Sequence, residues 1–128
     1  MRKGAALLGV LLAVSVQAEP DAGALLKSAA PEEREKGIAQ LADTRTVAVA
    51  KQLMPLLSDP DWGVRMAAAR ALGPIEFEPA RGLLFKTAIR GETRRLRTLA
   101  ATLLRDHAPG FAAAKLKSMA RKLTKEDR

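Results

Sequence analysis

The residues that could do chemistry in this chain are few and lie apart from one another. Histidine occurs once, at His107, and cysteine does not occur. Metal sites need several converging His, Cys or carboxylate ligands, and covalent catalysis needs a nucleophile with a base and a group that orients the base. The sequence contains no Gly-x-Ser-x-Gly motif and no glycine-rich phosphate loop. It therefore predicts a protein without a metal, a cofactor or an enzymatic activity, in which His107 is a surface or helix-end residue.

Paired carboxylates are the next candidates for chemistry, and they occur at Glu32-Glu33, Asp59/Asp61 and Glu76/Glu78. Each pair falls at the start of an expected helix. Negative charge is favourable there because it faces the positive end of the helix dipole. We therefore interpret these pairs as helix-start residues.

Basic residues dominate the second half of the chain. The formal net charge is +8, with −3 over residues 19–63 and +9 over residues 64–128. A cluster at Arg90, Arg94 and Arg95 is a candidate site for anionic surfaces, although a charge run is also typical of a solvated helix face. Aromatic side chains that would stack on bases are not interleaved with it, which disfavours nucleic acid as a partner.

The first residues have the layout of a secretory signal peptide. Arg2 and Lys3 precede an apolar run over residues 5–16, and small residues follow at Val16-Gln17-Ala18. The run is shorter than the roughly 20 residues that a membrane-spanning helix needs. We expect cleavage after Ala18 and a secreted or periplasmic protein, with residues 19–123 as its domain and residues 124–128 as a charged tail.

The organising feature is an internal repeat of 31 and 32 residues. Three rows keep this period: Arg34, Arg65 and Arg97; Gly37, Ala68 and Ala100; Leu41, Leu72 and Leu104. Leu53, Leu84 and Leu116 form a further row in the same register and are expected to line one shared interior. A small residue three positions after the arginine lies on its helical face and lets a neighbouring helix approach closely, while the leucine fills the layer beneath.

Each unit is expected to hold two helices, because Ala and Leu dominate the composition. First helices are predicted over residues 31–42, 60–72 and 92–106, and second helices over 46–57, 78–89 and 109–123. Asp59 is expected to cap the helix that begins at Pro60, and Pro55 to kink the second helix that contains it. Residues 20–29 match half a unit and would cover the first exposed core face.

The segment from Asp59 to Gly73, DPDWGVRMAAARALG, resembles HEAT repeats, specifically the short variety first noted in phycobilin lyases. The resemblance implies an all-α fold, an α-α superhelix: a short right-handed α-solenoid of about three helix pairs with an N-terminal half-repeat. It also implies a polar ladder between units, made by an inter-helix Asp and a following Arg. Only Asp59 with Arg65 fits this pattern fully, because Ser28 and Gly91 occupy the corresponding positions of the other units.

The function expected from this fold is an exported, non-enzymatic scaffold that binds an acidic protein partner. In HEAT proteins the second helices usually line the concave face, which here would carry Lys51, Arg81, Lys86 and Lys115. An alternative is a binder of anionic polymers or envelope surfaces through the basic half, and salt dependence separates the two. A lyase or chaperone for a bound cofactor is disfavoured by the missing Cys and Tyr. Trp62, the only tryptophan, is expected either to cover a seam between units or to anchor a partner.

Overall fold

The computed structural model describes residues 21–126, and all regular structure in this range is helical. The elements are α2 (Ala22–Leu26), α3 (Pro31–Leu41), α4 (Val47–Leu53), the 3-10 helix η1 (Met54–Ser58), α5 (Trp62–Leu72), α6 (Glu78–Arg90), α7 (Arg94–His107) and α8 (Pro109–Glu126). The all-α prediction is confirmed. The expected signal peptide and its cleavage site lie outside the described residues, and the described part of the expected tail continues α8.

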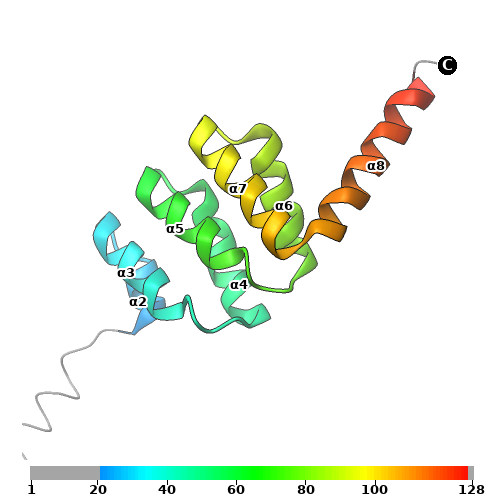
Figure 1. Ribbon diagram of the computed structural model, residues 1–128. Coiled ribbons are helices and arrows are strands. Elements are labelled where there is room, and N and C mark those ends of the chain that lie inside the picture. Colours follow the sequence, from blue (N-terminus) through cyan, green and yellow to red (C-terminus); the bar gives the residue numbers. More distant parts are fainter. Residues whose placement is uncertain (1–20, 127–128) are drawn as a thin grey trace, which may run out of the picture.

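The helices form two rows, with α3, α5 and α7 side by side in one and α2, α4 and α6 behind them (Figure 1). The closest pairs are α2 with α3, α4-η1 with α5, and α6 with α7. These packed pairs differ from the two-helix units of the sequence repeat. The second helix of each unit packs mainly on the first helix of the next unit, so the pairs are shifted by one helix. α8 leaves the stack after the last of these pairs, and its main contact is with α7.

The small residues of the repeat lie where neighbouring helices approach most closely. Gly37, Ala68 and Ala100 are all buried. A Cβ atom added at Gly37 would lie 3.0 Å from the Cβ of Leu25 and 3.1 Å from the carbonyl oxygen of Ala22, so α2 could not pack on α3 at this distance over a larger side chain. The half-unit at the N-terminal end thereby covers the core, as the sequence predicted.

The leucine rows are only partly internal. Leu72 and Leu104 are buried, whereas Leu41 is half-buried against the core. In the second row Leu53 and Leu84 are 0% and 1% exposed, but Leu116 is 57% exposed. The prediction that the second row lines one shared interior is wrong for Leu116, because none of the described helices packs over its side of α8.

Two local signals of the sequence have different outcomes. Pro55 coincides with a change of helix type, since α4 ends at Leu53 and continues as the 3-10 helix η1. This agrees with the expected kink, because proline lacks the amide hydrogen that an α-helix requires. The expected cap of α5 is wrong: Asp61 is the N-cap and its carboxylate accepts a hydrogen bond of 3.0 Å from the amide of Val64. Asp59 lies outside the helix and has another partner.

Candidate functional site

Each of the three repeated arginines donates a hydrogen bond to the turn that precedes its own helix. Arg34 donates to the carbonyl oxygens of Ser28 and Ala29 at 2.9 and 3.0 Å, and Arg65 donates to the carbonyl oxygen of Asp59. Arg97 does the same to the carbonyl oxygen of Gly91 at 2.7 Å. These accepting positions, 28, 59 and 91, repeat with the period of the sequence. Each arginine therefore satisfies a carbonyl group that the turn itself leaves unpaired.

Two of the arginines also reach forward to a carboxylate of the next unit. Arg34 makes two parallel hydrogen bonds with Asp59, each 2.9 Å long. Arg65 reaches Glu92 at 2.6 Å. The ladder suggested by the family resemblance thus exists, but its pairing differs from the expected Asp59–Arg65 pair, because the carboxylate of Asp59 turns toward the unit before it.

Gly91 explains why the second carboxylate comes from the neighbouring position. A Cβ atom at Gly91 would lie 2.6 Å from the carbonyl oxygen of Thr87, which excludes an aspartate in this slot. Glu92 has a longer side chain and reaches Arg65 from one residue further along. The glycine that stands in place of the aspartate is therefore compensated by the carboxylate of the next residue.

Asp59 is the buried charged residue of the described core, at 7% exposure. Burial alone raises the pKa of its carboxyl, but hydrogen bonds from Arg34 and from the amide of Asp61, with the nearby charges of Arg34 and Arg65, outweigh burial. The pKa of Asp59 consequently lies below its ordinary value, and the hydrogen bond to Asp59 raises the pKa of Arg34. The ion pair of Arg34 and Asp59 therefore links two adjacent units of the repeat.

The four basic residues expected on the partner-binding face occupy different settings. Lys51 is exposed on α4 beside a groove toward α2, and Lys86 is exposed on α6. Arg81 is partly buried near the start of α6 and donates to the carbonyl oxygen of His107 at 3.3 Å. Lys115 lies on α8 with its ammonium 5.6 Å from the ring centre of Phe111. That these four residues bind a partner stays a prediction. Arg81 also has a contact within the chain, its hydrogen bond to His107.

The cluster of Arg90, Arg94 and Arg95 surrounds the turn between α6 and α7, and all three side chains are exposed. Arg90 borders a small pocket of mixed polar and apolar lining that also contains Lys86, Arg65 and Glu92. Arg95 instead lies over the ring of Trp62 on α5, 5.4 Å from its centre. The cluster is therefore divided between two surfaces.

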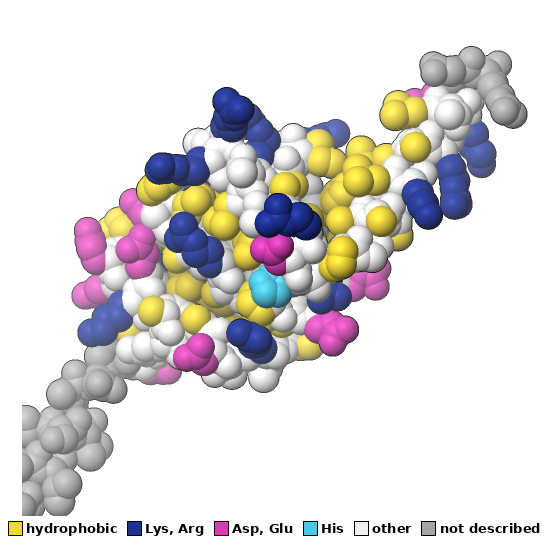
Figure 2. Space-filling view, viewed as in Figure 1, with side chains coloured by type: hydrophobic (Ala, Val, Ile, Leu, Met, Phe, Trp, Pro, Cys, Tyr) yellow, Lys and Arg dark blue, Asp and Glu magenta, His cyan; other side chains and the backbone are white. Residues whose placement is uncertain are grey.

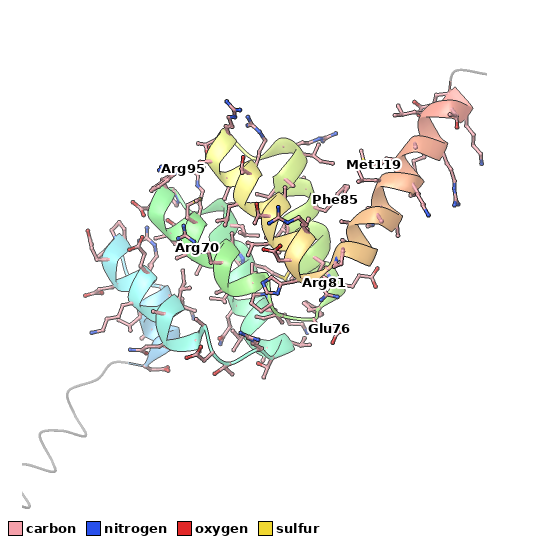
Figure 3. All side chains as sticks on the ribbon, in the orientation of Figure 1. Arg70, Glu76, Arg81, Phe85, Arg95 and Met119 are labelled. Carbon is pink, nitrogen blue, oxygen red and sulfur yellow. The ribbon has the colours of Figure 1, made fainter. Side chains whose placement is uncertain are left out.

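A groove between α5 and α7 gathers the features that favour recognition of a protein. Trp62 is 46% exposed at the start of α5, and the groove beside it is lined by Met66 and Arg70 of α5 and by Arg95, Thr98, Leu99 and Thr102 of α7. Figure 2 shows dark blue side chains with yellow ones between them on this face of the molecule, and Figure 3 shows Arg70 and Arg95 on it. We call this surface the Trp62 groove.

Sequence reasoning did not single out Arg70 as a functional residue. The spacing contained a signal, because residues 62, 66 and 70 are four apart and share one helix face. The partner helix carries a matching stripe at residues 95, 98, 99 and 102. That these two stripes face each other depends on α5 and α7 being neighbours, which the repeat implies only once its first helices are known to form a single row.

A second groove, almost entirely apolar, opens at the C-terminal end of the stack. It has a volume of about 420 Å³. Its walls come from three helices: Phe85, Ala88 and Ile89 of α6; Ala101, Leu104 and Arg105 of α7; Pro109, Ala112, Ala113 and Leu116 of α8. Phe85 on α6 and Met119 on α8 lie on opposite sides of the space between these helices in Figure 3. Phe85 is partly exposed on this groove.

Two further properties concern ions and membranes. Within residues 21–126, no three His, Asp or Glu side chains are grouped so that they could hold a metal ion. Among the same residues, none of the helices has the length and apolar character needed to cross a bilayer. His107 is exposed at the C-terminal end of α7, as the sequence suggested.

Comparison with known proteins gives one result. No curated protein and no solved structure matches the chain. The family model for HEAT repeats matches residues 20–114, a span that includes every helix from α2 to α7 and the start of α8. The match agrees with the rows of helices and with the arginine ladder, and it covers most of the chain, so the protein belongs to the family of HEAT-repeat proteins.

Proposed function

We propose that this protein is an exported scaffold that binds an acidic segment of a partner protein in the Trp62 groove. HEAT repeats are commonly scaffolds for protein interaction and are generally without enzymatic activity. The observation that carries the finer proposal is the half-exposed Trp62 with Arg95 over its ring and Arg70 on the same helix face.

The chemistry of this groove suits an acidic protein segment. A tryptophan supplies a large apolar contact at little cost in conformational entropy, and Trp and Arg are enriched among the residues that dominate binding energies. The arginines can donate paired hydrogen bonds to carboxylates. An apolar centre with a cationic border distinguishes this surface from a purely charged one, which would favour a polymer of anions.

Export is part of the proposal and is supported by the N-terminal sequence. The basic residues Arg2 and Lys3, the apolar run that follows and the small residues around Ala18 occur in the order of a signal peptide. Mass spectrometry of the protein from the exported fraction should find Glu19 as its first residue. A protein that retains Met1 and stays inside the cell contradicts this part.

The binding proposal is tested by capture from the exported fraction with wild-type protein and with Trp62→Ala, Arg70→Ala and Lys36→Ala variants. Loss of the same captured protein with the first two variants, and its retention with Lys36→Ala, supports the groove. Lys36 is a matched control because it is an exposed cation on α3, outside the groove. Equal capture by all four proteins refutes the assignment.

Salt and fluorescence give independent readouts. Binding of a polymer of anions weakens steeply between low and moderate salt because counterions are released on binding, whereas a protein interface with an apolar centre persists. Since Trp62 is the only tryptophan, its emission reports occupancy of the groove directly. A captured protein that leaves the emission unchanged binds elsewhere.

A further inference from the structure

The C-terminal end of the stack has two features that the proposed function leaves unused. The first is the end of the arginine ladder. Arg34 reaches Asp59 and Arg65 reaches Glu92, but among the described residues no carboxylate pairs with Arg97. Arg97 holds its own turn by donating from Nη1 to the carbonyl oxygen of Gly91, and among the described residues its Nε and Nη2 have no hydrogen-bond partner.

The second feature is the apolar face of α8. None of its described residues is buried, and Leu116, Met119 and Leu123 are 57%, 41% and 62% exposed. With Ala112 they follow intervals of four, three and four residues, which place them on one stripe of the helix. Ile89 of α6, 44% exposed, lies across the adjoining apolar groove. An apolar surface of this kind beside an open groove is typical of a docking site.

The stack itself shows what fits there. α2 is covered by α3, α4-η1 by α5, and α6 by α7, whereas α8 is the fourth helix of this series and no described helix covers it (Figure 1). The residues just before α5 and α7 supply the carboxylates of the ladder. Asp59, before α5, pairs with Arg34 of α3, and Glu92, before α7, pairs with Arg65 of α5. A helix that covered α8 would lie beside α7, and a carboxylate before its first turn would meet Arg97.

The positive charge of α8 indicates which kind of helix could cover it. Lys115 lies three residues after Ala112 and four before Met119, and Lys122 lies three residues after Met119, so both border the apolar stripe. Lys117, Arg121 and Lys125 add positive charge to the rest of α8. The α8 of a second copy would bring the same cations against these, whereas a helix with acidic flanks would neutralise them.

We propose that α8 and the apolar groove beside it bind an amphipathic helix with acidic flanks from a partner protein. This helix continues the row of α3, α5 and α7, and a carboxylate at its N-terminal end pairs with Arg97. The site is separate from the Trp62 groove and does not depend on it. It is completed by the partner in the way that each inner pair of the stack is completed by the chain.

The probe is a synthetic helix of about 18 residues, long enough to be marginally helical alone. It carries leucines at intervals of four, three and four, glutamates at both flanks and one aspartate before the first turn. A companion peptide has lysines in place of the glutamates. We expect the acidic peptide to bind the full chain with a Kd below about 100 µM in fluorescence anisotropy, and the lysine peptide to bind at least about tenfold more weakly.

Two variants of the chain test the position of the site. Leu116→Glu should weaken binding of the acidic peptide by about tenfold or more, whereas Ala114→Glu, on the face of α8 opposite the apolar stripe, should change it by less than about threefold. Both add one negative charge to the same helix at an exposed residue, so both should keep the helical circular dichroism of the wild type. Trp62→Ala should leave the affinity unchanged, which separates this site from the proposed function.

Exchange of the peptide's aspartate for asparagine tests the pairing with Arg97. Asparagine caps a helix as well as aspartate does, so the exchange removes mainly the charge. We expect about a fivefold loss or more with the wild-type chain and little loss with Arg97→Gln. An equal loss with both chains refutes the pairing, and the affinity of the wild type for the two peptides remains informative if the Arg97 variant does not fold.

Three results would overturn the proposal. One is failure of the acidic peptide to bind, or equal binding of the lysine peptide. Another is an equal loss of affinity with Leu116→Glu and Ala114→Glu. The last is a dimer of the chain at the same concentration that Leu116→Glu converts to a monomer, because a second copy would then be the natural occupant of α8.

Discussion

Three leucines at equivalent positions of the repeat should differ in their contribution to stability. Leu53, Leu84 and Leu116 share one register in the sequence, but the first two are 0% and 1% exposed and the third is 57% exposed. Truncation of a buried leucine to alanine removes its transfer free energy and leaves a cavity, at a cost of about 3 kcal/mol. A leucine that is already largely in water loses less than about 0.5 kcal/mol.

The expected result is therefore a loss of about 3 kcal/mol for Leu53→Ala and for Leu84→Ala, and little change for Leu116→Ala. For a domain of this size, about 3 kcal/mol corresponds to a decrease in Tm of roughly 12–20 °C. The assay is urea unfolding followed by helical circular dichroism, on the purified protein without a partner. Equal m values for the four proteins would show that the midpoints report stability.

The comparison refutes the reasoning if Leu116→Ala costs as much as Leu84→Ala. That result would mean that α8 folds back over the stack in solution, or that another molecule covers it. A small loss at all three positions would contradict the buried row itself. The first of these outcomes would also count against the open groove at the end of the stack.

Further predictions concern the joints between helices. Asp59→Asn should lower the free energy of unfolding by about 2 kcal/mol at neutral pH, because Arg34 loses its charged partner. The pKa of Asp59 is lower in the folded protein than its ordinary value of 3.8. The stabilisation by the ionised carboxylate is therefore fully present above pH 3.8 and is lost as the pH falls through the folded pKa. Over that pH range the difference in urea midpoint between wild type and Asp59→Asn should shrink. Gly37→Val should lower the free energy of unfolding by about 1–3 kcal/mol, because it overpacks the contact between α2 and α3. Gly82→Ala should instead stabilise α6 by about 0.5–1 kcal/mol, because its added Cβ would meet no atom within 4 Å. Thr93→Ala should cost about 1 kcal/mol through loss of the α7 N-cap, and a thermal melt that shows no decrease in Tm would contradict the cap.

The arginine ladder illustrates how far a repeat can be read. The period of Arg34, Arg65 and Arg97 predicted equivalent structural positions, and all three do hold the turn before their own helices. The resemblance to HEAT repeats implies that Asp59 pairs with the following Arg65, whereas the carboxylate pairs with Arg34, 25 residues away. Arg65 meets only the backbone carbonyl oxygen of Asp59, because the stacking of units brings the helix of the preceding unit, with Arg34, to the carboxylate.

The cap of α5 shows a similar competition between local and tertiary partners. Asp59 and Asp61 are both suited to an N-cap, and Pro60 favoured the first of them as the helix boundary. The partly buried guanidinium of Arg34 engages Asp59, and the helix then begins two residues later with Asp61 as its cap. A charge-assisted pair with two hydrogen bonds outweighs the preference of proline for the first helical position.

The sequence alone determined the helical class, the period of the stack and the small residues at its closest contacts, because helix propensity and apolar spacing are local properties that each unit repeats. Only the tertiary structure decided which arginine meets which carboxylate, that Trp62 and Arg95 share a groove, and that Leu116 stays exposed while Leu53 and Leu84 are buried. The physical reason is that a periodic stripe specifies which face of a helix can be buried. Whether another helix arrives to bury that face depends on where the whole chain places its neighbours.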